Sequence, residues 1–262
     1  MSEGLRGEEA ELFSCWLEGL AGDVLRRISV DWRFLGREEQ MPPPGDWHTW
    51  LMLGGRGSGK TRAGAEWVHG LATGEVDGLN TDGRIALVGE TFADAREVMI
   101  DGVSGIVTIA RRERPRYEST RRRLLWPSGA VAQIFSSEDP ESLRGPQFAA
   151  AWCDELGKWR HAQETWDMLQ FGLRLGTDPR QLVTTTPRPT PLLLAMVKDR
   201  ATVVTNIRTT DNADNLASGF IDAIRARYAG TRLGRQELDG ELIADRPDGL
   251  WRRSQLENLV TR

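Results

Sequence analysis

The sequence predicts an α/β fold with a mostly parallel central sheet and helices on both of its faces. Short apolar runs alternate with amphipathic helical segments along most of the chain, and strands that alternate with helices typically pair in parallel. One apolar run, residues 50–53, is followed by a glycine-rich loop and then by a helical segment. That succession of strand, loop and helix is typical of phosphate-binding α/β folds.

The predicted elements follow from apolar patterning and from glycine and proline. Strands are expected at residues 50–53, 84–89, 116–126, 130–135, 148–153, 181–186 and 202–207. Helices are expected within residues 8–28, 60–71, 92–100, 161–173, 191–198, 216–228 and 232–242. The strands at 116–126 and 130–135 should be antiparallel, joined by a turn at Pro127–Gly129. Residues 33–47 should be irregular, because prolines at 42–44 forbid regular structure.

The composition is that of a globular protein without a membrane span. The chain has 262 residues, 39% hydrophobic and 27% charged, enough for one large α/β domain or two small ones. Neither a spanning apolar run nor a signal peptide is present. Its two cysteines make a disulfide framework unexpected and lack metal-ligand spacing, so a reducing cytoplasm is expected. The formal net charge of −4 argues against coating nucleic acid by bulk charge, but allows a motor that contacts DNA through a few side chains.

The glycine-rich loop has the pattern Gly-x-x-x-x-Gly-Lys-Thr of nucleotide hydrolases. Its glycines let several backbone N–H groups point at one phosphate. The lysine would reach the β- and γ-phosphates, and the threonine hydroxyl would ligate Mg²⁺. ATP and Mg²⁺ are therefore the expected ligands, and the expected contacts are Gly54, Gly55, Arg56, Gly57, Ser58, Gly59, Lys60 and Thr61.

A carboxylate pair ends the apolar run Phe148–Glu155. A phosphate loop needs a second carboxylate for Mg²⁺, and such a residue sits at the end of a buried strand. Asp154 is expected to hold the metal, directly or through water. Glu155 is expected to polarise the attacking water as general base.

Two further groups of residues have more than one interpretation. Thr184, Thr185 and Thr186 end a predicted strand beside the ligand crevice, where their hydroxyls could sense the γ-phosphate or orient water, or simply favour a strand. Arg56 and Arg144 could each stabilise transition-state charge, in cis or from a neighbouring subunit, or be solvated surface charges.

Seven arginines gather in a short stretch between the second and fourth predicted strands. They could contact a phosphate backbone, although the solvated face of a hairpin is the slightly favoured interpretation. The cluster consists of Arg111, Arg112, Arg114, Arg116, Arg121, Arg122 and Arg123.

The order of these segments resembles that in the large terminase subunits of tailed bacteriophages and of phage-derived gene transfer agents. The resemblance rests on the loop continuing to Trp67, on the acidic strand 152–155, on Thr184–Pro187 and on the stretch Tyr228–Glu241. It covers about Trp32 to Leu250. The phosphate loop alone is shared by many families, whereas the combination of segments is much more specific.

The resemblance implies a RecA-like ATPase motor that packs double-stranded DNA into a preformed capsid through a portal ring. Glu155 would be the catalytic carboxylate, and Thr184–Thr186 would be the motif that couples hydrolysis to subdomain movement. Gln40 would contact the adenine. Arg144 would be a finger acting on the neighbouring subunit, with Arg56 as the rival acting in cis.

The resemblance also implies partners and a division of the chain. The partners would be double-stranded DNA, the portal protein and the small terminase subunit. The chain would form a homo-oligomeric ring on the portal and could be a monomer in isolation, in the cytoplasm of a bacterial host. Residues 1–205 would form the ATPase core with an N-terminal helical extension, and residues 206–262 a lid and linker.

These large subunits usually carry a C-terminal nuclease domain, for which too few residues follow Asp248–Trp251. We therefore expect no nuclease activity from this chain. The alternative function is a helicase or another nucleic-acid translocase of the same fold, which would separate strands without a capsid partner. A small-molecule kinase would not need the water-activating Glu155, and a non-enzymatic nucleotide-binding module would not hydrolyse ATP.

Overall fold

The computed structural model describes residues 7–76 and 83–243. The chain divides into two compact units, Met1–Pro42 and Pro43–Arg262. The predicted boundary between core and lid, at residue 206, stays a prediction, and the predicted linker after residue 243 lies outside the described residues. Within the described ranges, no helix is long and apolar enough to cross a membrane.

The first unit is helical. It contains α1 (Gly7–Glu18), α2 (Gly22–Ile28), α3 (Trp32–Leu35) and the 3₁₀ turn η1 (Glu38–Gln40). Helix within residues 8–28 is thus confirmed, whereas the prediction of irregular chain from residue 33 is wrong up to residue 40. The Asp31 side chain accepts a hydrogen bond from Arg33 N at 3.0 Å and caps α3, because such a side chain satisfies a backbone donor of the first turn.

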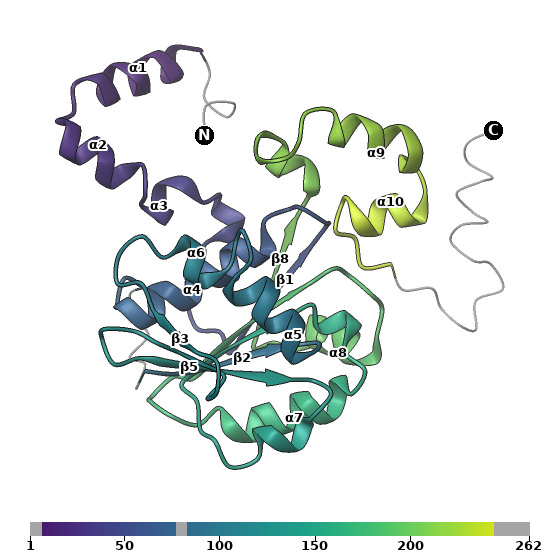
Figure 1. Cartoon of the computed structure of the whole chain (residues 1–262). Coiled ribbons are helices and arrows are strands. Elements are labelled where there is room, and N and C mark those ends of the chain that lie inside the picture. Colours follow the sequence, from purple (N-terminus) through teal and green to yellow (C-terminus); the bar gives the residue numbers. More distant parts are fainter. Residues whose placement is uncertain (1–6, 77–82, 244–262) are drawn as a thin grey trace, which may run out of the picture. The chain divides into compact units, whose positions relative to one another are not determined.

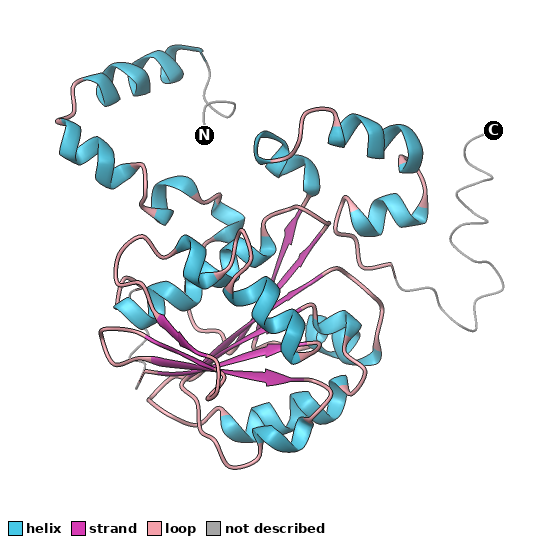
Figure 2. Cartoon of the chain, in the orientation of Figure 1, coloured by secondary structure: helices cyan, strands magenta, loops and turns pink. Residues whose placement is uncertain are grey.

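The second unit is built on an eight-stranded sheet in the order β3-β4-β5-β2-β6-β7-β1-β8 (Figure 2). Six strands from β5 to β8 in this order run parallel, and β3 and β4 form an antiparallel edge. The bounds are β1 (Thr49–Gly54), β2 (Arg84–Gly89), β3 (Arg116–Glu118), β4 (Arg123–Leu125), β5 (Val131–Ser136), β6 (Ala150–Asp154), β7 (Arg180–Thr185) and β8 (Thr202–Ile207). The predicted fold class is confirmed.

The antiparallel edge differs from the prediction. Residues 116–126 form two strands rather than one, because the chain turns between β3 and β4, with Arg122 at a φ of 51°. The Arg122 guanidinium lies 3.9 Å from the centre of the Phe92 ring, a cation–π contact that holds this turn against the next layer. The turn predicted at Pro127–Gly129 is confirmed, since Trp126 N donates to Ala130 O at 3.0 Å.

Helices cover both faces of the sheet, as Figure 1 shows. One face carries α4 (Lys60–Thr73), α5 (Phe92–Asp94), the π-helical segment η2 (Ala95–Ile100) and α6 (Ile106–Ile109). The other carries α7 (Ala162–Gly172) and α8 (Pro191–Lys198). Between α7, α8 and the sheet lies a core that includes Leu51, Val88, Phe135, Cys153, Val183, Leu169 and Leu193. Because both faces are covered, the central strands are continuous apolar runs.

Shorter elements connect the strands and end the described chain. They are η3 (Pro140–Leu143), η4 (Leu156–Lys158), η5 (Thr209–Asn215), α9 (Phe220–Tyr228) and α10 (Arg232–Glu237). The helix predicted from residue 216 starts only at Phe220, after Gly219 at a φ of 78°. The helix predicted over 232–242 ends at Glu237.

Gly64 lets α4 lie directly on β6. A Cβ at this position would overlap the indole of Trp152, and both residues are buried. We predict that Gly64→Ala destabilises the fold by about 1–3 kcal/mol, because overpacking a dense core outweighs the gain of about 1 kcal/mol from replacing a helical glycine. Urea unfolding measures the change.

The matched control is Gly22→Ala in α2, where the nearest atom to an added Cβ, Arg26 Nη1, is 3.8 Å away. That variant should be neutral or slightly more stable. A Gly64→Ala protein as stable as the wild type would contradict the close packing of α4 on β6.

Candidate active site

The phosphate loop connects β1 to α4 and turns through glycines. Gly57 and Gly59 have φ angles of 72° and 94°, a region that side-chain-bearing residues rarely adopt. Ser58 between them is fully buried. The loop thus brings the amino end of a 14-residue helix, with its free backbone N–H groups, to the carboxyl end of β1. Such a helix end favours bound anions.

Lys60 is buried inside this loop, with 6% of its surface exposed. Its ammonium donates hydrogen bonds to Gly54 O at 2.9 Å and Gly55 O at 2.8 Å, and lies 3.9 Å from Glu155 Oε1. Burial lowers the pKa of Lys60, and the charges of Glu155 and Asp154 oppose that effect. The ammonium is therefore positioned between the loop and the acid pair.

Asp154 is held by the threonine next to it in the sheet. β7 lies between β1 and β6, and Thr184 pairs with Asp154 in the register. The Thr184 hydroxyl donates to Asp154 Oδ1 at 2.6 Å and accepts from Trp152 Nε1 at 2.8 Å. Burial, followed by the nearby Glu155 charge, raises the pKa of Asp154 to about 6, so a cation beside this carboxylate would be strongly favoured.

Glu155 turns out of the strand toward solvent. Its backbone adopts φ 50° and ψ 41°, a left-handed conformation that is uncommon outside glycine and often marks functional sites. The carboxylate accepts from Thr186 N at 3.2 Å and Thr186 Oγ1 at 3.3 Å, and its side chain is 24% exposed. Two consecutive acids thus have different environments, one buried and one accessible to water.

A cavity of about 180 Å³ opens beside the acid pair. It is lined by Thr61, Gly89, Glu90, Asp94, Ala95, Val98, Met99, Asp154, Glu155 and Lys158. Thr61 and Asp154 therefore share one cavity, as a Mg²⁺ site completed by phosphate oxygens and water requires. A hydroxyl and a carboxylate are hard oxygen ligands that suit this metal. The residues present fit Mg²⁺, with Thr61 and Asp154 as the side chains that would hold it.

Arg56 is tied to the segment after β8. Its Nε lies 2.9 Å from Glu237 Oε2, and its backbone N donates to Glu237 O at 2.7 Å. Thr209 Oγ1 donates to Arg56 O at 2.8 Å, and Asn212 Nδ2 to Gly57 O at 2.7 Å. The phosphate loop is therefore hydrogen-bonded to η5 and to the end of α10.

Two residues predicted for the site do not line this cavity. Arg144 follows η3, is 69% exposed and lies 3.3 Å from Glu141, which is equally exposed. Gln40 belongs to the first unit, in η1, where its Oε1 accepts from Arg37 N at 3.1 Å. The roles predicted for these two residues stay predictions.

The arginine cluster lies at the antiparallel edge and along the chain before it. Arg116 and Arg123 pair with Glu118 at 2.6 Å and 2.7 Å, and Arg122 covers Phe92. Arg114 and Arg121 are exposed. Part of the cluster thus serves the hairpin itself, while exposed members leave both predicted interpretations open.

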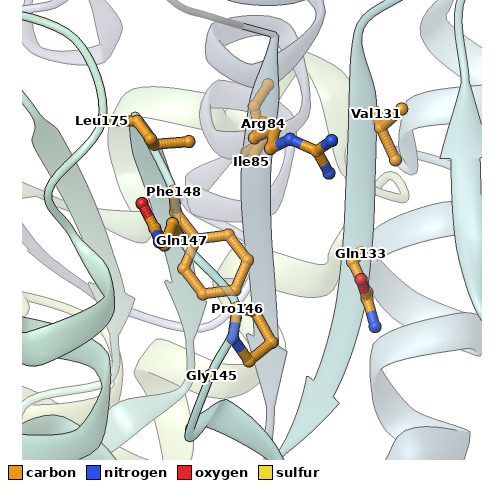
Figure 3. Close-up of a pocket in the computed structure, with 9 residues that line it drawn as sticks. All are labelled: Arg84, Ile85, Val131, Gln133, Gly145, Pro146, Gln147, Phe148 and Leu175. Atoms are coloured by element: carbon orange, nitrogen blue, oxygen red, sulfur yellow. The ribbon is translucent and has the colours of Figure 1, made fainter.

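A larger cavity, of about 320 Å³, lies elsewhere. Figure 3 shows its lining, namely Arg84, Ile85, Val131, Gln133, Gly145, Pro146, Gln147, Phe148 and Leu175. Arg84 and Val131 begin β2 and β5, so this cavity lies toward the amino ends of the strands, whereas the phosphate loop follows the carboxyl end of β1. The site is assigned by its chemistry, not by cavity size.

Sequence reasoning missed three residues of this site. Glu237 pairs with Arg56, Trp152 holds the Thr184 hydroxyl, and Lys158 lies 3.8 Å from Glu155 Oε2. Lys158 had a signal in the sequence, since the chain has only three lysines. Glu237 had none, because an ion pair over such a sequence distance depends on the fold.

The sheet order, the glycine loop and the acid pair define a P-loop ATPase. The class requires a loop lysine, a metal-binding carboxylate and a water-activating residue on neighbouring elements. All three are present at the carboxyl ends of β1 and β6.

Comparisons with known proteins narrow this class. Residues 51–258 match the family model of the terminase large subunit, T4likevirus-type, N-terminal. That match spans most of the chain, and the chain belongs to this family, the ATPase domain that powers packaging of DNA into phage capsids. The match decides against the helicase alternative. No curated protein sequence matches the chain significantly.

Solved structures share the fold at low identity. The large terminase ATPase domain of Thermus phage P74-26 is 15% identical, with a TM-score of 0.59 over 85% of this chain and 98% of that one. The large terminase of another thermophilic bacteriophage, in complex with ADP, is 14% identical, with a TM-score of 0.60 over 86% of this chain and 54% of that one. The chain thus spans about half of this second terminase.

Removing the Thr184 hydroxyl tests the metal assignment. We predict that Thr184→Val raises the Mg²⁺ concentration needed for half-maximal nucleotide binding about tenfold, because a charged hydrogen bond to Asp154 is lost. Binding of a fluorescent ATP analogue during a Mg²⁺ titration measures it.

Thr184→Ser keeps the hydroxyl and is the matched control. It should bind Mg²⁺ almost as the wild type does, and thermal unfolding of both variants separates metal binding from loss of the Trp152 contact. Equal Mg²⁺ dependence in Thr184→Val and wild type would remove Thr184 from the metal site.

Proposed function

We propose that this chain hydrolyses ATP with Mg²⁺ at the site described above and uses that energy to move double-stranded DNA into a capsid. One observation carries the proposal. The Glu155 carboxylate stands within 4 Å of the loop lysine, with Lys60 Nζ at 3.9 Å, and opens on a cavity shared with Thr61 and Asp154. A base, a phosphate-binding cation and a metal site therefore converge at one place.

The chemistry follows from these positions. Lys60 leaves the carbonyls of its own loop to bind the β- and γ-phosphates. Glu155 takes a proton from water as the water oxygen attacks the γ-phosphorus and the bond to the β–γ bridging oxygen breaks. Thr61 and Asp154 would hold Mg²⁺, which when bound neutralises phosphate charge. The Thr186 donors orient Glu155 toward the water.

The coupling role of Thr184–Thr186 has a physical basis in this geometry. Thr184 bonds Asp154 and Thr186 bonds Glu155, so both carboxylates are attached to one strand end. Movement of either acid during hydrolysis is transmitted to β7. The Arg56–Glu237 pair would carry a change in the loop to the proposed lid, from residue 206 onward.

Family membership supports the proposed partners. Terminase large subunits power DNA packaging, and we propose double-stranded DNA, the portal protein and the small terminase subunit as partners, with ring assembly on the portal in the cytoplasm of a bacterial host. The second thermophilic-phage terminase has been solved with ADP and with ATP-γ-S, which supports a nucleotide as the ligand here. Gln40 is proposed to contact the adenine.

Glu155→Gln tests the proposed base. The variant should bind ATP with wild-type affinity and lower kcat roughly 10²- to 10⁴-fold, because an amide cannot accept the proton from water. Phosphate release and fluorescent-nucleotide binding measure the two properties.

The control is Glu164→Gln, an exposed glutamate in α7 that should hydrolyse ATP normally. Near-normal turnover by Glu155→Gln would show that Glu155 is not the base. Retained turnover that is also insensitive to Lys60→Ala would place ATP hydrolysis elsewhere.

The two arginine candidates make opposite predictions in mixed rings. If Arg144 acts on the neighbouring subunit, Arg144→Ala and Glu155→Gln chains should each be inactive alone but regain activity when mixed, because some interfaces then combine an intact base with an intact arginine. Loss of such a finger costs roughly 10³- to 10⁵-fold. ATPase assays on portal-assembled mixtures measure the rescue.

Arg56→Ala mixed with Glu155→Gln is the comparison. An arginine acting in cis gives no rescue, because every site lacks one of the two groups. An active Arg144→Ala chain, together with an inactive Arg56→Ala chain that is never rescued, would assign the finger to Arg56.

A further inference from the structure

Two of the three lysines in this chain stand at one carboxylate. The lysines are Lys60, Lys158 and Lys198, while the rest of the 34 basic residues are arginines. Lys60 Nζ lies 3.9 Å from Glu155 Oε1, and Lys158 Nζ lies 3.8 Å from Glu155 Oε2. The loop motif accounts for Lys60 and leaves Lys158 unexplained.

The carboxylate of Glu155 is nearly symmetric in its contacts. Each oxygen has one donor from Thr186, the backbone N on Oε2 and the hydroxyl on Oε1, and one ammonium within 4 Å. When Lys60 turns to the phosphates, as the proposed function requires, Lys158 remains as the cation beside the base.

The backbone under Lys158 is firmly held. Lys158 ends η4, where its N donates to Glu155 O at 2.8 Å, and Gly157 N donates to Thr185 Oγ1 at 2.9 Å. The stem therefore starts from a fixed point, and its direction is not left to a flexible loop.

Lys158 also faces the cavity next to the phosphate loop. Among the described residues that line this cavity it is the only basic one, with Thr61, Glu90, Asp94, Asp154 and Glu155 as the other polar members. The side chain is 33% exposed. An ammonium has three donors, so the contact with Glu155 leaves others available toward the cavity. A structural ion pair with Glu155 would need no such opening.

We propose that Lys158 is a second phosphate-binding cation, which contacts the terminal phosphate of ATP, or the phosphate released from it, on the side opposite Lys60. The inference rests on the proposed function, because it takes the terminal phosphate to lie between Lys60 and Glu155. Its ligand chemistry is a tetrahedral phosphate oxyanion. Lys158 remains protonated throughout, and no bond to it forms or breaks.

Competitive amine labelling tests this in the unaltered protein. A limiting amount of an acylating reagent labels the three lysines, and mass spectrometry quantifies each site separately. The protein is labelled alone, with Mg²⁺ and ADP, with Mg²⁺, ADP and inorganic phosphate, and with Mg²⁺ and ATP-γ-S. Lys198, exposed at the end of α8, is the internal control.

The arms separate the two sources of phosphate. Labelling of Lys158 should fall at least about fivefold with ATP-γ-S relative to ADP if the terminal phosphate of the bound nucleotide is the ligand. A comparable fall with ADP plus inorganic phosphate would assign the released phosphate. Equal Lys158 labelling in all nucleotide arms, with Lys60 protected, overturns the proposal while leaving nucleotide binding intact.

A variant pair gives an independent readout. Lys158→Gln should weaken binding of ATP-γ-S about tenfold, the loss of one charged hydrogen bond, and leave ADP binding unchanged, whereas Lys158→Arg should recover most of the affinity. Lys198→Gln should change neither. If Lys158→Gln weakens ADP and ATP-γ-S equally, or changes neither, Lys158 is only a structural partner of Glu155.

The outcome is distinct from failure of the proposed function. Normal turnover by Glu155→Gln would overturn the proposed function. A slow Glu155→Gln chain, combined with unprotected Lys158, would overturn only the second-cation proposal.

Discussion

The position of β7 between the loop strand β1 and the acid strand β6 is the constraint on which this site depends. Met52 and Leu53 pair with Thr184 and Thr185 on one side of β7, and Asp154 pairs with Thr184 on the other. The strand therefore separates the loop from the acid pair by one strand spacing, and its threonines fill that gap. Without an intervening strand, the metal carboxylate would lie directly against the loop lysine.

That spacing also decides how two buried charges are tolerated. An ion taken out of water costs several kcal/mol unless it is paired and hydrogen-bonded. Lys60 meets two carbonyl oxygens of its own loop, and Asp154 meets the Thr184 hydroxyl. Neither forms a close ion pair with the other, so each keeps its charge available for a ligand of opposite sign. The raised pKa of Asp154, about 6, reflects a carboxylate that is stabilised only in part.

The parts of the site that are local in the chain could be predicted from the sequence. The loop, the acid pair and the threonine strand end each lie within eight residues, and the apolar strand β2 (Arg84–Gly89) has the predicted bounds. Strand order is not local, so the contact between Thr184 and Asp154 is not predictable from either segment. The edge hairpin is predicted as one strand because the turn at Arg122 contains neither glycine nor proline.

The link between Arg56 and Glu237 shows how a local event at the loop becomes a movement elsewhere. The two residues share an ion pair and a backbone hydrogen bond, and Thr209 bonds the same loop residue. A phosphate that attracts the Arg56 guanidinium competes directly with Glu237, because one guanidinium cannot hold both in the same geometry. The pair is largely exposed at Arg56, at 69%, so breaking it costs little. The backbone bonds persist and transmit the displacement to α10. An exchangeable side-chain contact beside a fixed backbone contact is therefore the arrangement that coupling between the loop and the segment after β8 requires.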